Sequence, residues 1–165
     1  MAVRVGQGFD VHRFTDDTVR PLVLGGVTFP GEPGLDGHSD ADVIAHAAAE
    51  AVLGAAGLGD LGQHFPDTDP AWAGADSLRI LAASAAMVRE AGWEIGNVDV
   101  SVVCETPKLA PHRTAIERNL SDAALAPVTV KGRRAEGLGA LGRREGIACW
   151  AVAVAQPLRL SLIHI

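Results

Sequence analysis

The sequence predicts an α/β domain (α+β by some schemes), a mainly mixed β-sheet covered by helices, and three observations support this. The chain has 165 residues, which suits one compact domain with a core of its own. Its aromatic residues are only three tryptophans and four phenylalanines, so alanine, valine and leucine must fill thin layers. Segments with strand and helix patterns alternate along the chain.

Each predicted element rests on a local signal. Strands are inferred from alternating apolar and polar residues. Helices are inferred from apolar residues at helical spacing after a capping residue, such as Ser39 with Asp42 three residues later, or Asp76 with Ser77. In chain order, the sequence predicts a strand over 3–7 running towards Phe14, a strand over 22–29 bent or bulged at Gly25-Gly26, a helix over 43–53 capped by Ser39, a polar loop over 59–70, a helix from 76 to about 91, a strand over 98–104, a helix over 111–124, a strand over 128–131 and a strand over 147–154.

Composition and charge exclude several function classes. The formal net charge is −6 with both signs interspersed, whereas a nucleic-acid-binding surface normally shows a basic stripe. No apolar run reaches the roughly 18 residues of a membrane span, and the N-terminus lacks the apolar core of a signal peptide. Cys104 and Cys149 lie in apolar, strand-like runs and are predicted to be buried free thiols. The sequence therefore predicts a cytoplasmic protein without a nucleic-acid or membrane partner.

Three side chains near the N-terminus have the chemistry of a zinc site. Asp10 and His12 are two residues apart on an extended segment, so both leave it on the same face. His46 follows in the predicted helix, one turn beyond Asp42. A carboxylate and two imidazoles suit a tetrahedral zinc with an open fourth position. Taken singly, each also fits a structural role, His46 as a helix histidine packed on alanine.

Other polar segments fit a phosphorylated substrate, and each has a structural alternative. His38 and Ser39 lie where the predicted helix begins and free N–H groups favour a phosphate, although Ser39 could simply cap the helix. Asp60, Asp67 and Asp69 could accept hydrogen bonds from sugar hydroxyls or serve as loop formers. The remaining candidates are the 106–108 segment at a strand end and a basic group that could grip a diphosphate or form a solvated patch, namely Lys131, Arg133, Arg134, Arg143 and Arg144.

Several sequence blocks together resemble the 2-C-methyl-D-erythritol 2,4-cyclodiphosphate synthase family. They occur in the family's order and span residues 3–154, so the combination is far more specific than any single block. The blocks are Gly8-Phe9-Asp10-Val11-His12, Gly37-His38-Ser39-Asp40-Ala41-Asp42-Val43, Leu58-Gly59-Asp60-Leu61-Gly62, Phe65-Pro66-Asp67-Thr68-Asp69-Pro70, Gly96-Asn97-Val98-Asp99-Val100, Pro107-Lys108 and Arg143-x-Glu145-Gly146-Ile147-Ala148.

The resemblance implies a homotrimer with active sites between subunits and a reaction in the non-mevalonate route to isoprenoids. The 2-phosphate of 4-diphosphocytidyl-2-C-methyl-D-erythritol 2-phosphate would attack the β-phosphorus of its own cytidine diphosphate arm. The products would be 2-C-methyl-D-erythritol 2,4-cyclodiphosphate and CMP. The enzyme class is a phosphorus–oxygen lyase, and the nucleophile belongs to the substrate.

By position, the resemblance also assigns roles to individual residues. Asp10, His12 and His46 match zinc ligands, with a β-phosphate oxygen as the fourth. Glu136 matches the single protein ligand of a Mg²⁺ or Mn²⁺ ion that bridges the substrate phosphates. His38 matches a residue beside the reacting phosphate. Residues 104–110, including Lys108, match the cytidine-diphosphate pocket contributed by the adjacent subunit. The full set expected to contact substrate is Asp10, His12, His38, Ser39, Asp60, Leu61, Gly62, Phe65, Pro66, Asp67, Thr68, Asp69, Thr106, Lys108, Arg133, Arg134, Ala135, Glu136 and Arg143.

The sequence departs from the family pattern in two places. The family carries a run of threonines before the acidic residue, but here the run is Gly132-Arg133-Arg134-Ala135. Arg134 stands where a phosphate-orienting threonine is expected, and we hypothesise that Arg133 or Arg134 takes over this catalytic role. Ala140 stands where an aromatic residue usually lines the trimer axis, which disfavours the isoprenoid diphosphate binding known for some members.

Two other functions remain as alternatives at this level. A zinc-dependent hydrolase of a nucleotide diphosphate would keep the metal site and use water as nucleophile. A catalytically silent trimeric relative that binds metal or nucleotide would fit the altered 132–135 run. The catalytic domain is expected over residues 1–156, and the apolar tail over 157–165 is either an extra edge strand or a non-native end.

Overall fold

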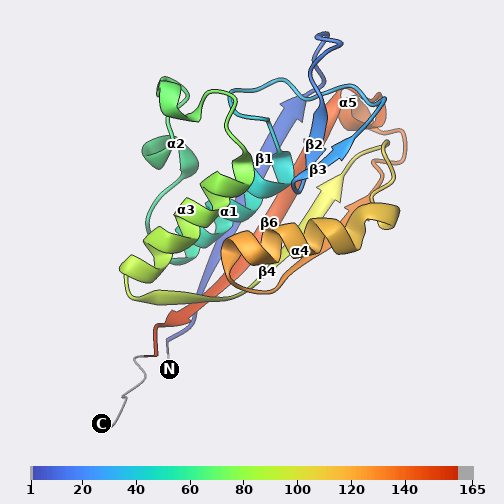
Figure 1. The fold of residues 1–165 in the computed structure, drawn as a ribbon. Coiled ribbons are helices and arrows are strands. Elements are labelled where there is room, and N and C mark those ends of the chain that lie inside the picture. Colours follow the sequence, from blue (N-terminus) through green and yellow to red (C-terminus); the bar gives the residue numbers. More distant parts are fainter. Residues whose placement is uncertain (1, 160–165) are drawn as a thin grey trace.

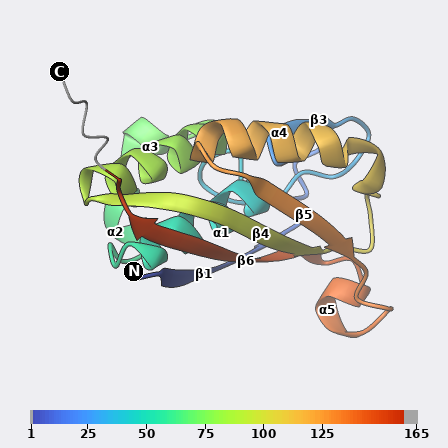
Figure 2. The same cartoon turned by 90° about the horizontal axis from the view of Figure 1, so that it is seen from below.

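A four-stranded mixed sheet with helices on one face forms the body of the molecule. The computed structural model describes residues 2–159, and Figures 1 and 2 show the helices α1, α3 and α4 on one side of the sheet. The strands follow the order β1-β6-β4-β5. The elements are β1 (Arg4–Arg13), β2 (Leu22–Leu24), β3 (Val27–Phe29), α1 (Val43–Ala55), α2 (Leu61–His64), the 3₁₀ turn η1 (Pro70–Trp72), α3 (Ser77–Glu90), β4 (Trp93–Val103), the 3₁₀ turn η2 (Ala110–His112), α4 (Arg113–Ala124), β5 (Val128–Arg133), α5 (Gly139–Gly142) and β6 (Gly146–Pro157).

The pairing of the strands confirms the mixed sheet. β6 lies between β1 and β4 and is antiparallel to both, whereas β4 and β5 are parallel. The parallel pair needs a crossover, and α4 supplies it. The last strand, β6, is therefore an inner strand, and the first strand, β1, is the edge strand beside it.

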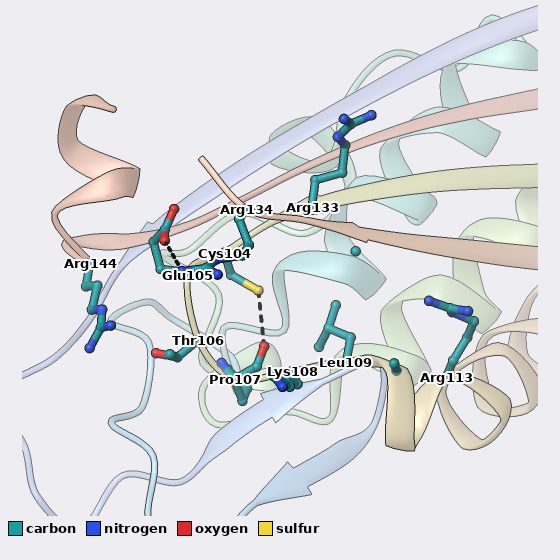
Figure 3. A pocket seen from close by; sticks show the side chains of 12 residues that line it. Cys104, Glu105, Thr106, Pro107, Lys108, Leu109, Arg113, Arg133, Arg134 and Arg144 are labelled. Atoms are coloured by element: carbon teal, nitrogen blue, oxygen red, sulfur yellow. Dashed lines mark hydrogen bonds and ion pairs between the residues drawn. The ribbon is translucent and has the colours of Figure 1, made fainter. Parts of the chain in front are cut away.

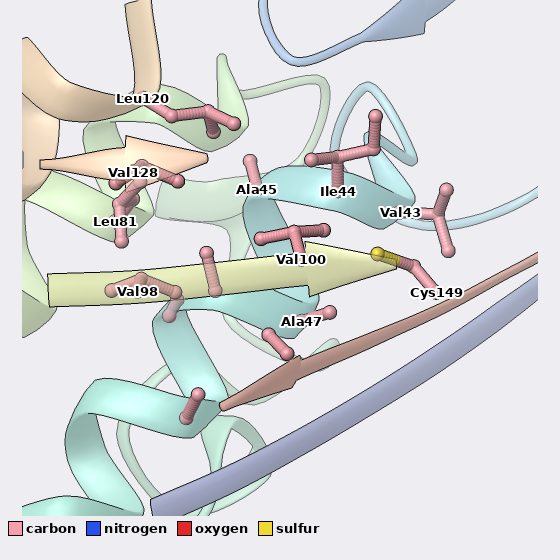
Figure 4. Close-up of a cluster of buried hydrophobic side chains, with 14 of the residues drawn as sticks. Val43, Ile44, Ala45, Ala47, Leu81, Val98, Val100, Leu120, Val128 and Cys149 are labelled. Carbon is pink, nitrogen blue, oxygen red and sulfur yellow. The ribbon is translucent and has the colours of Figure 1, made fainter. Parts of the chain in front are cut away.

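The core explains why an alanine-rich helix suits this fold. Ten of the thirteen residues of α1 are buried, most of them alanine, so α1 lies very close to the sheet. Figure 4 shows Ala45 and Ala47 of α1 beside Val98 and Val100 of β4. Gly6 and Gly8 allow this approach, because a Cβ at either position would collide with backbone of α1. The close contact sets the metal-site candidates on β1 directly against α1.

Residues 22–29 form a hairpin rather than the single bent strand that the sequence predicted. Gly25 and Gly26 have φ of 56° and 73°, which is the left-handed backbone that a tight two-residue hairpin turn requires. β2 and β3 therefore make a separate two-stranded sheet. A glycine pair between two short apolar runs is itself a hairpin signal, and the bend interpretation overlooked it.

The cap of the first helix is Asp42 and not Ser39. The Asp42 side chain accepts hydrogen bonds from the N–H groups of Ile44 and Ala45, and also from those of Gly25 and Gly26 in the hairpin turn. The free N–H groups that the sequence placed beside His38 and Ser39 are thus already used by Asp42. The predicted contact of His38 and Ser39 with a phosphate must therefore depend on their own side chains and not on the N–H groups at the start of α1.

The other predicted helices and strands are confirmed, with β4, β5 and β6 longer than expected, whereas α2, inside the predicted loop over 59–70, and α5 were not predicted. Cys104 and Cys149 are buried free thiols, as predicted. Pro157 ends β6, and Leu158 N donates to Gly92 O at 2.9 Å, while the part of the predicted tail over 160–165 lies outside the described residues. Across residues 2–159, none of the helices is long and apolar enough to cross a membrane.

Candidate functional site

Asp10, His12 and His46 come together as one cluster. Asp10 and His12 project from β1, and His46 projects from the first turns of α1. Asp10 Oδ2 lies 2.9 Å from His12 Nε2 and 3.0 Å from His46 Nδ1. One ligand atom from each residue lies within 4.8 Å of the others, so a single ion could contact all three. The sequence prediction of a shared site is therefore confirmed in its geometry.

A hydrogen bond behind His12 determines which nitrogen of its ring carries the proton. His12 Nδ1 lies 2.8 Å from the backbone O of Asp36, which can only accept, so Nδ1 carries the proton. In the neutral ring, His12 Nε2 is then a buried lone pair that faces Asp10 Oδ2 and has no donor, whereas in the protonated ring it donates to Asp10. An orphaned acceptor facing a carboxylate is a natural position for a cation. The donor set therefore fits a metal, and the partners behind the ligands orient them for it.

Proximity to the imidazoles also sets the charge of the cluster. Burial alone would raise the pKa of Asp10, but hydrogen bonds and charge interactions with His12 and His46 outweigh it and lower the pKa to about 2. Burial alone would lower the pKa of His12, yet the hydrogen bond and charge of Asp10 raise it above the ordinary 6.5. A metal needs the neutral imidazole, so a proton on His12 and a cation compete for the same place.

A cleft of about 260 Å³ opens from this cluster, and we call it the metal cleft. His38 lies in it with Nε2 3.4 Å from the backbone O of Asp69. Trp72, which is partly buried, and Ile80 also line the cleft and were missed from the sequence, although a tryptophan in a polar segment is a usable signal for a sugar platform. The lining residues are Asp10, His12, Gly37, His38, Ser39, His46, Leu61, Gly62, Phe65, Asp67, Trp72 and Ile80.

Asp60 and Asp69, two predicted sugar-binding aspartates, cap short helices. Asp60 Oδ1 accepts from Gln63 N at 3.0 Å at the start of α2, and Asp69 Oδ1 accepts from Ala71 N at 2.9 Å at η1. Neither lines the metal cleft, and neither do Pro66 and Thr68 beside them. The structural alternative thus accounts for both carboxylates in this chain, and only Asp67 of the three faces the cleft.

A second cleft of about 350 Å³, the cationic cleft, lies at the ends of β4 and β5 (Figure 3). The predicted residues Thr106, Lys108, Arg133 and Arg134 all line it. Glu105 lies in the 104–110 segment that the resemblance assigned to a nucleotide pocket, whereas Arg113 was not predicted. The lining residues are Cys104, Glu105, Thr106, Pro107, Lys108, Leu109, Ala110, Arg113, Gly132, Arg133, Arg134 and Arg144.

The cationic cleft carries an excess of positive charge. Lysine and arginine side chains line it at several positions, and Glu105 is the acidic residue among the lining set. Arg134 Nη2 donates to Glu105 Oε2 at 3.4 Å, a long contact by an arginine that is 67% exposed. Burial would raise the pKa of Glu105, but N–H groups of Gly137 and Ala135 together with Arg134 lower it, so Glu105 is a carboxylate. An anionic ligand complements this cleft.

Ala135, Glu136 and Arg143 are three more predicted residues outside both clefts. Glu136, with φ of 54°, lines a neighbouring depression together with Lys131 and the two arginines before it. Arg143 Nε donates to Glu145 Oε2 at 2.6 Å on an exposed surface. The Ala135 carbonyl accepts from Leu138 N at 3.0 Å. Within one chain, the predicted site residues are therefore divided between separate surfaces rather than gathered in one pocket.

This fold, with a carboxylate–bis-histidine cluster in one cleft and a cationic second cleft, defines a class of α/β proteins built to bind a metal and an anion. Comparison with known proteins gives the particular family. The sequence profile of the YgbB family matches residues 3–156, and the chain belongs to this family. The family resemblance inferred from the sequence blocks is confirmed.

Curated relatives cover nearly the whole chain. A protein of Bordetella petrii named 2-C-methyl-D-erythritol 2,4-cyclodiphosphate synthase is 54% identical over 154 residues, which is 92% of this chain and 94% of that protein. A protein of the same name from Cyanothece is 50% identical over 156 residues, covering 93% and 96%.

Solved structures confirm the α/β fold. The bifunctional IspDF from Campylobacter jejuni superposes with a TM-score of 0.89 at 39% identity, over 95% of this chain but only 43% of that longer chain. The IspF of Plasmodium falciparum in its CDP complex gives a TM-score of 0.82 at 31% identity, over 96% and 98%.

Proposed function

We propose that this protein converts 4-diphosphocytidyl-2-C-methyl-D-erythritol 2-phosphate into 2-C-methyl-D-erythritol 2,4-cyclodiphosphate and CMP, with residues 1–156 as its catalytic domain. The observation that carries the proposal is the Asp10–His12–His46 cluster opening into a cleft, in a chain about half identical to synthases of that name. The two free, buried thiols suit the reducing cytoplasm, where we place the reaction.

The reaction needs no nucleophile from the protein. An oxygen of the substrate's 2-phosphate forms a bond to the β-phosphorus, and the bond from that phosphorus to the bridging oxygen breaks, so CMP leaves with the bridging oxygen. The thiol in the cationic cleft is unsuited to attack, because burial and the charge of Glu105 raise the pKa of Cys104 to about 11. Catalysis is then positioning and charge neutralisation.

In the metal cleft, Asp10, His12 and His46 would hold Zn²⁺, which when bound neutralises and polarises the β-phosphate. His38 and Ser39 lie beside this cluster in the cleft. His38 Nε2 would donate a hydrogen bond to a phosphoryl oxygen in place of its long 3.4 Å contact with the Asp69 carbonyl. The methylerythritol phosphate part would lie along Asp60, Leu61, Gly62, Phe65, Pro66, Asp67, Thr68 and Asp69, with Asp60 and Asp69 acting by holding the loop in shape.

In the cationic cleft, Thr106 and Lys108 would contact the cytidine diphosphate arm. Arg134 would turn from its long contact with Glu105 to the phosphates, with Arg133 beside it and Ala135 as backbone support. Glu136 would be the single protein ligand of Mg²⁺ or Mn²⁺, an ion that keeps waters and takes phosphate oxygens. Arg143 would act at the neighbouring surface on which it pairs with Glu145.

We propose a homotrimer in which the metal cleft of one subunit meets the cationic cleft of the next. One support is the division of the site residues between two clefts of the chain. The other is the sheet face turned away from the helices (Figure 2), where side chains alternate outward along β1 and β6. Large apolar residues stand exposed there, at 66% for Val5, 45% for Phe9, 50% for Val11, 38% for Trp150 and 43% for Val152.

Phosphorus NMR of the purified protein with the proposed substrate, Zn²⁺ and Mg²⁺ tests the activity. We expect CMP and a cyclic diphosphate in equal amounts. CMP with the open-chain methylerythritol 2,4-bisphosphate would instead identify a hydrolase. Unchanged substrate, in protein with a full complement of zinc, would identify a silent relative.

A further inference from the structure

A group of buried polar side chains lies behind His46, on the side of the ring away from Asp10. His46 Nε2 is 2.9 Å from Ser77 Oγ and 3.0 Å from Ser39 Oγ, and the two hydroxyl oxygens are 3.0 Å apart. Ser77 is fully buried and Ser39 nearly so. Ser77 is the first residue of α3, so this group joins the start of α3 to the metal-bearing helix α1.

The group ends at a carboxylate, and this fixes the direction of every proton in it. Asp40 accepts from the Ser77 hydroxyl, from Ser77 N at 3.2 Å and from Asp42 N at 3.1 Å. The Ser77 hydroxyl is the donor to Asp40 Oδ1, so the one hydroxyl proton of Ser77 points to Asp40. Ser77 Oγ therefore offers only lone pairs to its other two neighbours.

The hydrogen bonds of Ser77 determine which nitrogen of His46 carries the proton. A lone pair on Nε2 facing a lone pair of Ser77 Oγ at 2.9 Å would be repulsive, so Nε2 carries the proton and donates it. The Ser39 hydroxyl likewise donates to Ser77 Oγ, while Ala41 N donates to Ser39 Oγ at 3.3 Å. Nδ1 is left with the lone pair, directed at Asp10 and the metal position.

We infer that Asp40 and Ser77 are positioning residues that hold His46 in its metal-binding tautomer. Their influence opposes that of Asp10, whose Oδ2 lies 3.0 Å from Nδ1 and would accept a proton there in the metal-free protein. Asp10 and Asp40 thus favour different positions for the one imidazole proton. The Asp40–Ser77 pair favours Nε2, which leaves Nδ1 free to bind a metal. The inference rests on the proposed metal site, and it assigns roles to two residues outside the set expected to contact substrate.

Substitution of Ser77 should reverse the tautomer. In Ser77→Ala, the Ser39 hydroxyl loses Ser77 Oγ as its acceptor. His46 Nε2, which lies 3.0 Å from Ser39 Oγ, is then the acceptor left for the Ser39 hydroxyl proton. His46 Nε2 then becomes the lone pair, and the proton moves to Nδ1, where Asp10 accepts it. Ser84→Ala is the matched control, because Ser84 is also fully buried on α3 but donates to Ile80 O at 2.8 Å, away from the metal cluster.

Two measurements test the inference. The first is long-range ¹H–¹⁵N NMR of the histidine rings in the metal-free protein at about pH 9, where an ordinary imidazole is neutral. We expect the Nε2–H form of His46 in wild type and Ser84→Ala, and the Nδ1–H form in Ser77→Ala. The second is zinc affinity by competition with a chromophoric chelator, which should fall about 10- to 100-fold in Ser77→Ala relative to both.

An Nδ1–H form in the wild-type protein would overturn the inference without any variant. So would equal zinc affinity in Ser77→Ala and Ser84→Ala. A wild-type protein that shows the Nε2–H form but binds no zinc would refute the proposed metal site and leave the tautomer assignment standing, so the two failures are distinguishable.

Discussion

The metal cleft and the cationic cleft are built in different ways. In the metal cleft, the ligand residues are half-buried and hydrogen-bonded to the backbone and to serines behind them. In the cationic cleft, the arginines are exposed, and the contact of Arg134 with Glu105 is long. The metal cleft is therefore preorganised for an ion, whereas the arginines of the cationic cleft are placed to pair with an anionic ligand.

The largest expected effect comes from removing a charge in the preorganised cleft. Asp10→Asn keeps the size of the side chain but loses the anionic ligand, so zinc should no longer co-purify. We expect kcat/KM to fall about a thousand-fold or more. Metal analysis and turnover measure both. Asp16→Asn, at an exposed loop position, is the control, and a zinc-loaded, active Asp10→Asn would show that the cluster is not the metal site.

A smaller effect is expected in the cationic cleft. Arg134→Ala removes one charge-assisted contact to phosphate, and kcat/KM should fall about 10- to 100-fold with zinc content unchanged. Arg118→Ala, an exposed arginine of α4, should behave as wild type. Steady-state kinetics on both variants would decide the matter, and near-wild-type activity for Arg134→Ala would remove the idea that it replaces a phosphate-orienting threonine.

The smallest effect concerns pH. The pKa of His12 is raised by Asp10, so as pH falls through that raised value a proton increasingly occupies the metal position. Zinc affinity should therefore be at least about tenfold weaker at pH 6 than at pH 8. CDP affinity of the zinc-free protein, which depends on arginine and lysine charges, should change much less. Chelator competition and calorimetry at both pH values test this, and a pH-independent zinc affinity would contradict the assigned role of His12.

The sequence was sufficient for the metal ligands because their pattern is local. Asp10 and His12 share a face of one strand, and His46 lies in a strongly predicted helix. The cap of that helix was predicted wrongly, because Ser39 and Asp42 are both good caps and the choice depends on the N–H groups of the hairpin turn. That contact joins segments that are separated in the sequence, so a local residue pattern cannot predict it.

The roles of residues that act through tertiary contacts could not be predicted from the sequence pattern. Ser77 reaches His46 only because the start of α3 packs against the loop before α1. Asp60 and Asp69 were predicted to bind sugar because α2 and η1 are too short to show helical periodicity, so their capping roles were hidden. In the cationic cleft, the contact of Glu105 with Arg134 could not be predicted, because it depends on the turn after β4 that brings the two residues together.

The central claim is that the two clefts make one active site between neighbouring subunits, and subunit complementation tests it most directly. His46→Ala lacks a working metal cleft, and a Lys108→Ala, Arg134→Ala double variant lacks a working cationic cleft. Each should be nearly inactive alone. Refolded together in equal amounts, they should recover about a quarter of wild-type activity, because that share of interfaces joins two intact clefts. No recovery, in trimers shown to be mixed, would contradict the shared site.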